Sequence, residues 1–207
     1  MREHEQQRNG PGGFNRRDFL KGSGAVVAAT AIATAEQEAQ AQKAAAVQCP
    51  GKVGITLTVN GKQHKLSVEP RTTLLDALRD QLNLTGCKDD FDTTSCSGSD
   101  TVIIDGKAVY ASTRLAIEVQ GQKIQTVESL RDGDKIDEVI AGFVKHDAMQ
   151  CGFCTPGFVM ATRAFLNQKP KATLEEIQSG LGGNICRCGT YKGITACALE
   201  IAKKGGA

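Results

Sequence analysis

Four cysteines in the last third of the chain constrain its fold most, because they occur as two close pairs. Cys151 and Cys154 form a CxxC motif, and Cys186 and Cys188 form a CxC motif. Two cysteines separated by a single residue cannot readily form a disulfide with each other, so a shared metal site is favoured. Four thiolates satisfy a 2Fe-2S cluster, two on each iron. The same residues could hold structural zinc, or form two disulfides between the motifs in an oxidising compartment.

The first 41 residues resemble a twin-arginine export signal. Arg16 and Arg17 precede Phe-Leu-Lys, and a stretch of small apolar residues follows over 22–35. This stretch is shorter than the roughly 20 residues that a membrane-spanning helix needs. We therefore predict a periplasmic protein without a transmembrane anchor, cleaved after Ala41 and continued by a linker over residues 42–52.

Residues 53–125 have the pattern of a small sheet domain. Apolar and polar residues alternate on both sides of Asn60-Gly61, a pair suited to a two-residue hairpin turn. Leucines recur at helical spacing over 73–82, where Thr72 or Thr73 can cap the helix. Two more strands are expected over 101–110. Hairpin, helix, loop and strands is the element order of a β-grasp domain.

Residues 126–207 favour four short helices. Apolar side chains lie three and four positions apart over 137–146, 158–166 and 194–203, and Thr173 followed by two glutamates marks the start of another helix. Each cysteine motif falls at a helix boundary, where the chain can turn two thiolates toward one centre. The predicted fold class is α+β, with a β-grasp domain followed by a four-helix domain.

Composition and charge exclude several classes of function. The net charge is +2, from 25 basic and 23 acidic side chains, and no basic run could follow a phosphate backbone, so nucleic acid is not an expected partner. His4, His64 and His146 lie far apart without a neighbouring nucleophile motif, which argues against a histidine-based catalytic centre. With no tryptophan and 4% aromatic residues, we expect metal or a partner subunit to add stability.

Two segments carry a resemblance to a known family. QCGFCTPG begins at Gln150 and GNICRCGTY begins at Gly183, and together they resemble the signature of the small iron-sulfur subunit of molybdenum hydroxylases, the xanthine oxidase and aldehyde oxidoreductase family. The resemblance extends from about Val53 to the C-terminus and includes TLLDALR over 73–79. It makes zinc the lesser alternative. The ligands that it implies for a 2Fe-2S cluster are Cys151, Cys154, Cys186 and Cys188.

The resemblance also implies a partner. A large subunit would carry the molybdopterin cofactor, whose pterin Gln150 would contact, and would hydroxylate substrate with oxygen from water. Electrons would leave through this chain.

The first of the two clusters of that family does not carry over. Its plant-type ligation needs Cys-x4-Cys-x2-Cys and a later fourth cysteine. The residues at these four positions are Phe91, Cys96, Ser99 and Ser112. Asp100 is an added residue, and phenylalanine has no lone pair for iron. Cys87 would compensate only in a rebuilt loop with non-cysteine ligands, and a disulfide with Cys96 is the other alternative. Cys49 and Cys197 receive no role. We expect one functional cluster.

The leading hypothesis is an electron-transfer subunit of an exported molybdenum-dependent dehydrogenase of aldehydes or N-heterocycles. The chain itself would have no catalytic centre, and a flavin subunit or a cytochrome would accept the electrons. The second hypothesis is an assembly and export adaptor whose β-grasp domain has lost its cluster. A free-standing ferredoxin is disfavoured, because Gln150 and the segment 186–191 match the partner-facing pattern of the family.

Overall fold

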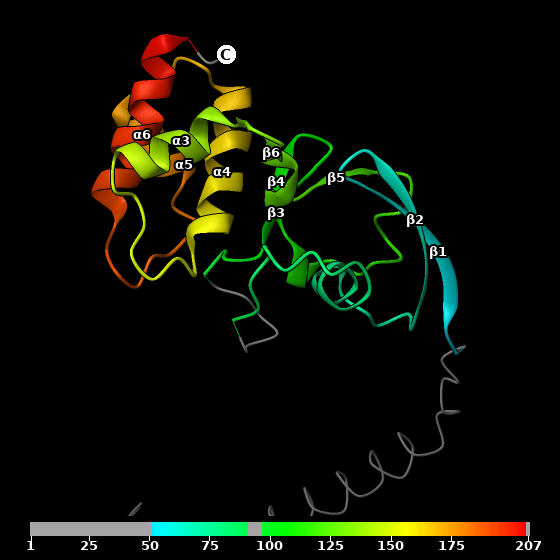
Figure 1. Ribbon diagram of the computed structural model, residues 1–207. Coiled ribbons are helices and arrows are strands. Elements are labelled where there is room, and N and C mark those ends of the chain that lie inside the picture. Colours follow the sequence, from blue (N-terminus) through cyan, green and yellow to red (C-terminus); the bar gives the residue numbers. More distant parts are fainter. Residues whose placement is uncertain (1–50, 91–96, 206–207) are drawn as a thin grey trace, which may run out of the picture. The chain divides into compact units, whose positions relative to one another are not determined.

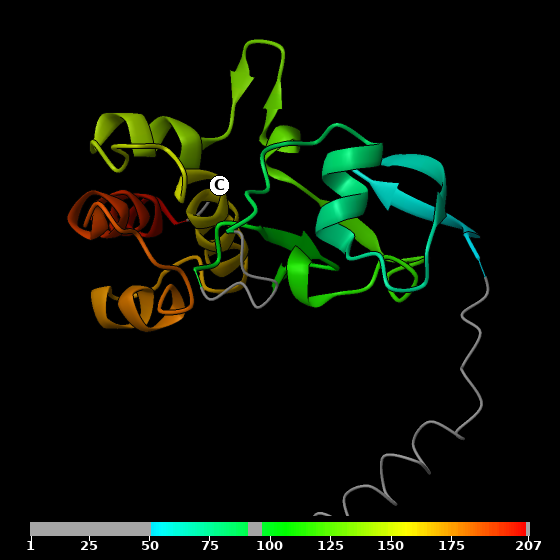
Figure 2. The same ribbon diagram turned by 90° about the horizontal axis from the view of Figure 1, so that it is seen from below.

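The computed structural model describes residues 51–90 and 97–205, and these belong to one compact unit. The first half forms a mixed five-stranded sheet with the order β2-β1-β5-β3-β4 (Figures 1 and 2). The strands are β1 (Val53–Val59), β2 (Lys62–Val68), β3 (Thr101–Ile104), β4 (Lys107–Tyr110) and β5 (Lys123–Gln125). β1 pairs antiparallel with β2 and parallel with β5, and β3 pairs antiparallel with β4 and β5. The short β5, which the sequence pattern did not predict as a strand, therefore joins the two hairpins into one sheet.

Residues with positive φ close both hairpins. Asn60 and Gly61 have φ values of 51° and 77°, and Asp105 and Gly106 have 48° and 81°. Two-residue hairpin turns of this left-handed geometry favour Asn, Asp and Gly, so both predicted hairpins are confirmed. The Asn60 side chain also accepts the N–H of Thr126 and donates to its Oγ1, each at 2.9 Å. The first turn is thereby attached to the end of β5.

The predicted helix over 73–82 is present, but its second half is wider than an α-helix. Thr73 caps α2 (Leu74–Asp76), because its hydroxyl accepts the N–H of Asp76 while the Asp76 carboxylate accepts the N–H of Thr73. The chain continues as the π-helical η1 (Ala77–Gln81), with Leu82 as its C-cap. The buried side chains of this segment join the core of the sheet: Leu74, Leu75, Ala77 and Leu78.

The second half forms four helices, as the apolar spacing predicted (Figure 1). They are α3 (Glu138–Lys145), α4 (Thr155–Gln168), α5 (Leu174–Gly180) and α6 (Tyr191–Lys204). α4 begins ahead of the expected Phe158, because Pro156 is accommodated in the first turn, where its missing N–H costs nothing.

Four further short elements were not predicted from the sequence: β6 (Arg131–Asp132), β7 (Lys135–Ile136) and the 3-10 turns η2 (Ala111–Thr113) and η3 (Val127–Leu130). Among the described residues, no helix is both long enough and apolar enough to cross a membrane.

Buried apolar residues form two main clusters. One lies in the sheet and includes Leu57 and Ile124, and the other lies among the helices and includes Phe143 and Phe158. A small third cluster links β3 to α4 and consists of Ile103, Met160 and Ala164. β3 is therefore buried along its whole length, and α4 is the helix through which the sheet contacts the helical half.

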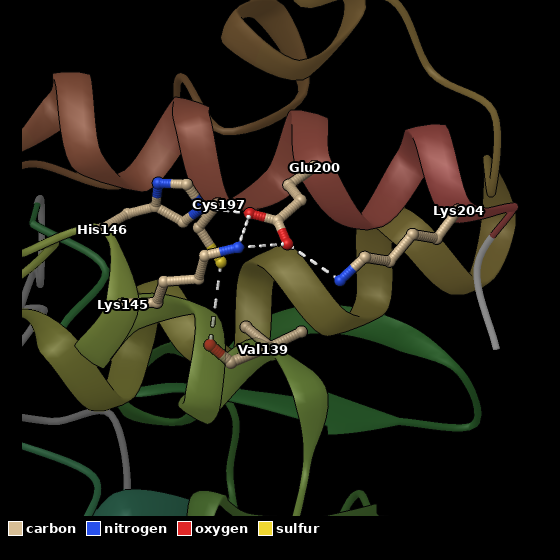
Figure 3. Close-up of polar contacts among 6 residues, drawn as sticks. All are labelled: Val139, Lys145, His146, Cys197, Glu200 and Lys204. Carbon is tan, nitrogen blue, oxygen red and sulfur yellow. Dashed lines mark hydrogen bonds and ion pairs between the residues drawn. The ribbon is translucent and has the colours of Figure 1, made fainter.

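Helices α3 and α6 are joined by a charged cluster around Glu200 (Figure 3). Lys145 Nζ lies 2.8 Å from both carboxylate oxygens, Lys204 Nζ lies 2.8 Å from one, and His146 Nε2 lies 2.6 Å from the other. Hydrogen bonds from Lys145, Lys204 and His146 lower the pKa of Glu200 to about 2. Because α3 ends at Lys145, the cluster fixes the start of the segment that leads to Cys151.

Candidate metal centre

The two cysteine motifs lie in two loops at the same end of the helical half (Figure 1). Cys151 and Cys154 belong to the loop that enters α4, and Cys154 is the N-cap residue of that helix. Cys186 and Cys188 belong to the loop between α5 and α6. Gly152 has a φ of 82°, a conformation that lets the chain turn between the two cysteines of the first motif.

The four thiols form two pairs, and each pair takes one sulfur from each motif. Cys154 interacts with Cys186, and Cys151 interacts with Cys188. The first pair is buried, since Cys154 has 8% and Cys186 has 5% of its surface exposed. Cys151 and Cys188 are both exposed. In the part of the chain that the structure describes, no three His, Cys, Asp or Glu side chains gather as a site for one metal ion. The two pairs nevertheless lie close together, because the charge of Cys186 acts on Cys151 and the charge of Cys151 acts on Cys154.

In the buried pair, one thiol ionises readily and the other retains its proton. Burial raises the pKa of Cys186, but hydrogen bonds from the Thr190 side chain and backbone outweigh burial and leave the pKa at about 7. Burial, followed by the hydrogen bond and the charge of Cys186, raises the pKa of Cys154 to about 12. A bound metal would displace the remaining proton, because thiols coordinate as thiolates.

The exposed pair has the same asymmetry. The backbone N–H of Phe153 and the Cys188 side chain lower the pKa of Cys151. For Cys188, a backbone hydrogen bond at Cys151 lowers the pKa, but the Cys151 side chain and desolvation outweigh that bond and raise it. Each pair therefore contains one thiol with a lowered pKa, Cys186 in the buried pair and Cys151 in the exposed pair.

Two helix N-termini meet at the motifs. Cys154 is the N-cap of the 14-residue α4, and Thr190 is the N-cap of the 14-residue α6. The partial positive charge of a helix N-terminus stabilises nearby anions. Tyr191 holds Cys186 in position, because its hydroxyl accepts the backbone N–H of Cys186 at 2.8 Å. The site is therefore suited to a group that carries negative charge.

The sheet holds the second motif through hydrogen bonds to the residues just before Cys186. The Ile185 N–H donates to the Ser97 carbonyl at 2.8 Å. The buried Asn184 amide donates to the Gly98 carbonyl at 2.8 Å and to Thr101 Oγ1 at 3.1 Å. The segment 97–101 of the sheet half is therefore a platform for the loop that carries Cys186 and Cys188.

The comparisons with known proteins identify the family to which the chain belongs. A model of the 2Fe-2S binding domain family matches residues 126–199. The chain is 39% identical over 204 residues to the aldehyde oxidoreductase iron-sulfur-binding subunit PaoA of Escherichia coli strain K12, covering 91% of this chain and 88% of that protein. The chain belongs to the family of small iron-sulfur subunits of molybdenum hydroxylases.

Other members extend the likeness. The chain is 40% identical over 149 residues to the nicotine 6-hydroxylase small subunit of Paenarthrobacter nicotinovorans, covering 72% of this chain and 89% of that protein. A chain of quinoline 2-oxidoreductase from Pseudomonas putida 86 superposes with a TM-score of 0.70 at 36% identity, covering 76% of this chain and 100% of that one.

The export prediction is also confirmed. A model of the twin-arginine translocation signal matches residues 13–33. This small iron-sulfur subunit is therefore exported by the twin-arginine route to the periplasm.

Gln150 lies at the exposed edge of the centre. It is exposed and directly precedes Cys151. Three exposed large side chains belong to the same two loops and to the first residue of α6: Phe153, Ile185 and Tyr191, with 42%, 48% and 43% of their surface exposed. The exposed thiol pair thus belongs to loops that present apolar side chains to solvent. The contact between Gln150 and a pterin stays a prediction.

The region of the family's first cluster is occupied by protein contacts. Phe91 and Cys96 lie outside the described residues. Ser99 Oγ lies 2.8 Å from Ser97 Oγ, and the Asp100 carboxylate accepts the N–H of Ser112 at 2.7 Å. Among the described residues, Ser112 Oγ is buried without a hydrogen-bond partner. Of the two serines at the ligand positions, Ser99 therefore has a hydroxyl partner, whereas Ser112 is held through its backbone N–H.

Cys87 is a buried thiol of the sheet core, 2% exposed. Burial, and then the charges of Glu128 and Asp100, raise its pKa to about 12. The raised pKa of Cys154 comes partly from neighbouring sulfurs that a metal would share. At Cys87, by contrast, carboxylates disfavour the ionised thiolate. This environment is unfavourable to a thiolate ligand.

Neither Asn184 nor Thr190 was predicted as a site residue from the sequence. Asn184 links the second motif to the sheet, and Thr190 Oγ1 lies 3.1 Å from Cys186 Sγ. A threonine at the start of a helix directly after a cysteine motif was the available signal for the second contact. The first contact joins residues 86 positions apart in sequence and has no local signal.

Proposed function

We propose that this chain passes electrons from a molybdopterin-binding large subunit to an acceptor through a single 2Fe-2S cluster. The cluster ligands are Cys151, Cys154, Cys186 and Cys188. The observation that carries the proposal is the pairing of the four sulfurs across the two motifs, with one pair buried and one exposed. When bound, such a cluster takes up and releases one electron at a time, with two thiolates on each iron.

The chemistry of the donors supports iron over the alternatives. Soft thiolates suit both iron-sulfur clusters and zinc, and the pairing of one sulfur from each motif could supply two thiolates to each of two irons. Two helix N-termini favour the net negative charge of a cluster with four thiolates. The match to a 2Fe-2S binding domain over residues 126–199 points the same way.

The exposed pair belongs to the loops that we assign to the partner interface. Gln150, Phe153, Ile185 and Tyr191 border Cys151 and Cys188 in these loops. Exposed apolar and aromatic side chains are typical of protein interfaces. Gln150 supplies an amide that can donate and accept hydrogen bonds, which suits the polar edge of a pterin.

The sheet half carries no second cluster in this proposal. Serine replaces cysteine at two of the ligand positions, Ser99 and Ser112, and Cys87 lies in an apolar core. Electrons therefore bypass the sheet half, and the acceptor docks on the helical half, nearer the remaining cluster.

The proposed architecture is a twin-arginine segment over residues 1–41, a linker over 42–52, a β-grasp domain over 53–125 and a helical 2Fe-2S domain over 126–207. The separate apolar clusters of the sheet and of the helices support the division.

The names of the relatives suggest the reaction. They include an aldehyde oxidoreductase subunit and a nicotine 6-hydroxylase subunit, so we infer an aldehyde or an N-heterocycle as the substrate class. Oxidation on the large subunit, with oxygen from water, releases two electrons and two protons. Both electrons leave in single steps through this chain to a flavin or haem acceptor, and the protons pass to water.

The replacement Cys154→Ser in the co-expressed complex tests this function. We expect normal assembly, loss of the reduced-cluster paramagnetic signal and loss of substrate oxidation with an added acceptor. Cys197→Ser is the matched control, because Cys197 is a buried cysteine of α6 whose thiol donates to the Val139 carbonyl at 3.7 Å. It should retain both signal and activity. Full activity in Cys154→Ser would contradict the electron-transfer role.

The adaptor function is a second candidate, favoured by the intact sheet that supports the second motif through Asn184 and Ile185. It predicts the opposite pattern for Cys154→Ser. The variant complex would then fail to assemble or to be exported, while any complex that formed would still oxidise substrate.

A further inference from the structure

The hydroxyl of Thr190 lies beside a proposed ligand instead of capping its own helix. Thr190 is the N-cap residue of α6, yet among the described residues its side chain makes no capping bond. An N-cap threonine usually accepts an N–H of the first turn, a bond worth about 1 kcal/mol. Here Thr190 Oγ1 lies 3.1 Å from Cys186 Sγ. The side chain therefore contacts sulfur and does not cap the helix.

The turn between the two residues is held in place on both sides. The Gly189 N–H donates to the Cys186 carbonyl at 3.2 Å, and Gly189 has a φ of 78°. The Cys186 N–H donates to the Tyr191 hydroxyl at 2.8 Å. Cys186 is 5% exposed, so water competes little for its sulfur. The contact from Thr190 is therefore part of a fixed turn.

We propose that Thr190 is a positioning residue that donates a hydrogen bond to the Cys186 sulfur and thereby raises the reduction potential of the cluster. The proposal rests on the proposed function, because Cys186 must be a ligand. A coordinated thiolate has no proton, so the hydroxyl must be the donor. Such a bond strengthens as negative charge on sulfur grows, so it stabilises the reduced state more than the oxidised state.

Burial explains why the contact is needed at this pair. The exposed Cys151 and Cys188 can be stabilised by water or by a partner, whereas the buried Cys154 and Cys186 lie where added negative charge is costly. The Thr190 hydroxyl offsets part of this cost. Without it, the cluster would be harder to reduce and would accept electrons from the large subunit less readily.

The test is a potentiometric titration of the purified, iron-loaded protein, followed by paramagnetic resonance. Thr190→Val removes the hydroxyl and keeps the shape. Hydrogen bonds to charged groups are stronger than neutral ones, and only the difference between the two redox states shifts the potential. We expect the equilibrium constant for reduction to fall about tenfold, which is about 59 mV for one electron.

Two controls define the result. Thr190→Ser keeps the hydroxyl and should titrate close to the native protein. Thr195→Val removes a hydroxyl from the same helix, where Thr195 Oγ1 donates to the Tyr191 carbonyl at 2.8 Å, and should leave the potential unchanged. If Thr190→Val does not load iron, Thr190→Ala removes the hydroxyl without putting a methyl group in its place and gives the comparison.

An unchanged potential in an iron-loaded variant without the hydroxyl overturns the proposal. Loss of iron in both hydroxyl-free variants, with iron retained in Thr190→Ser, also overturns it, because the hydroxyl would then be required for assembly. Failure of the proposed function is a separate result, since it would appear as zinc or absent iron in the native protein before any variant is compared.

Discussion

Asn184 links the cysteine loop of the helical half to the sheet, and its replacement by alanine should destabilise both together. Asn184 is 7% exposed and donates to the Gly98 carbonyl and to Thr101 Oγ1. Each buried hydrogen bond contributes about 1 kcal/mol, and the vacated space adds to the loss. We expect Asn184→Ala to lower the free energy of unfolding by about 2–3 kcal/mol. For a domain of this size, that lowers the melting temperature by roughly 4–12 °C.

The assay is thermal melting of the iron-loaded protein at one scan rate, with far-ultraviolet circular dichroism and cluster absorbance recorded together. Because Ile185 and Asn184 directly precede Cys186, absorbance should be lost at the same lowered temperature as secondary structure. Asn167→Ala is the control, since Asn167 is an exposed asparagine of α4 and should change stability by less than about 0.5 kcal/mol. Equal melting temperatures for the two variants would refute the role of Asn184.

Three further predictions concern the packing of the two halves, the charged cluster and the unused thiol. Gly157→Ala should destabilise the protein by about 1–3 kcal/mol in thermal melts, because the added Cβ meets the backbone carbonyl of Gly98; an unchanged melt would contradict this packing. Glu200 has a folded-state pKa of about 2, so its stabilisation is present above its usual pKa of about 4.3 and is lost as the pH falls through about 2. The urea midpoint of Glu200→Gln, read by circular dichroism just after a pH jump, should therefore lie below that of the native protein at pH 6 and approach it near pH 2, and a difference independent of pH would disprove the assignment. Cys87→Ala should leave the iron content unchanged in metal analysis while lowering stability by about 1 kcal/mol; a fall in iron would identify Cys87 as a ligand.

Features with local signals were predictable from the sequence. Both hairpins follow from residue pairs that tolerate positive φ, Asn60-Gly61 and Asp105-Gly106. The helices followed from apolar residues at helical spacing together with capping residues such as Thr173, whose hydroxyl accepts the N–H of Glu176. The two cysteine motifs could be recognised because their spacing is itself chemical information.

Features that depend on distant partners were not predictable. β5 has three residues and is a strand because it pairs with β1 and β3, which lie far away in sequence. The wider turn of η1 has no signal in a pattern of leucines that suits an α-helix equally well. Cys154 pairs with Cys186, and Cys151 with Cys188, only because two loops that are distant in sequence come together. The bond from Asn184 to Gly98 likewise joins distant segments.

The CxxC and CxC motifs together are proposed to hold one 2Fe-2S cluster, and the sheet half to hold none. Iron, sulfide and zinc analysis of the purified native chain, with paramagnetic resonance after dithionite reduction, distinguishes these possibilities. We expect about two irons and two sulfides per chain, with a single signal of about one spin. About four irons with two signals, or zinc in place of iron, would refute this assignment.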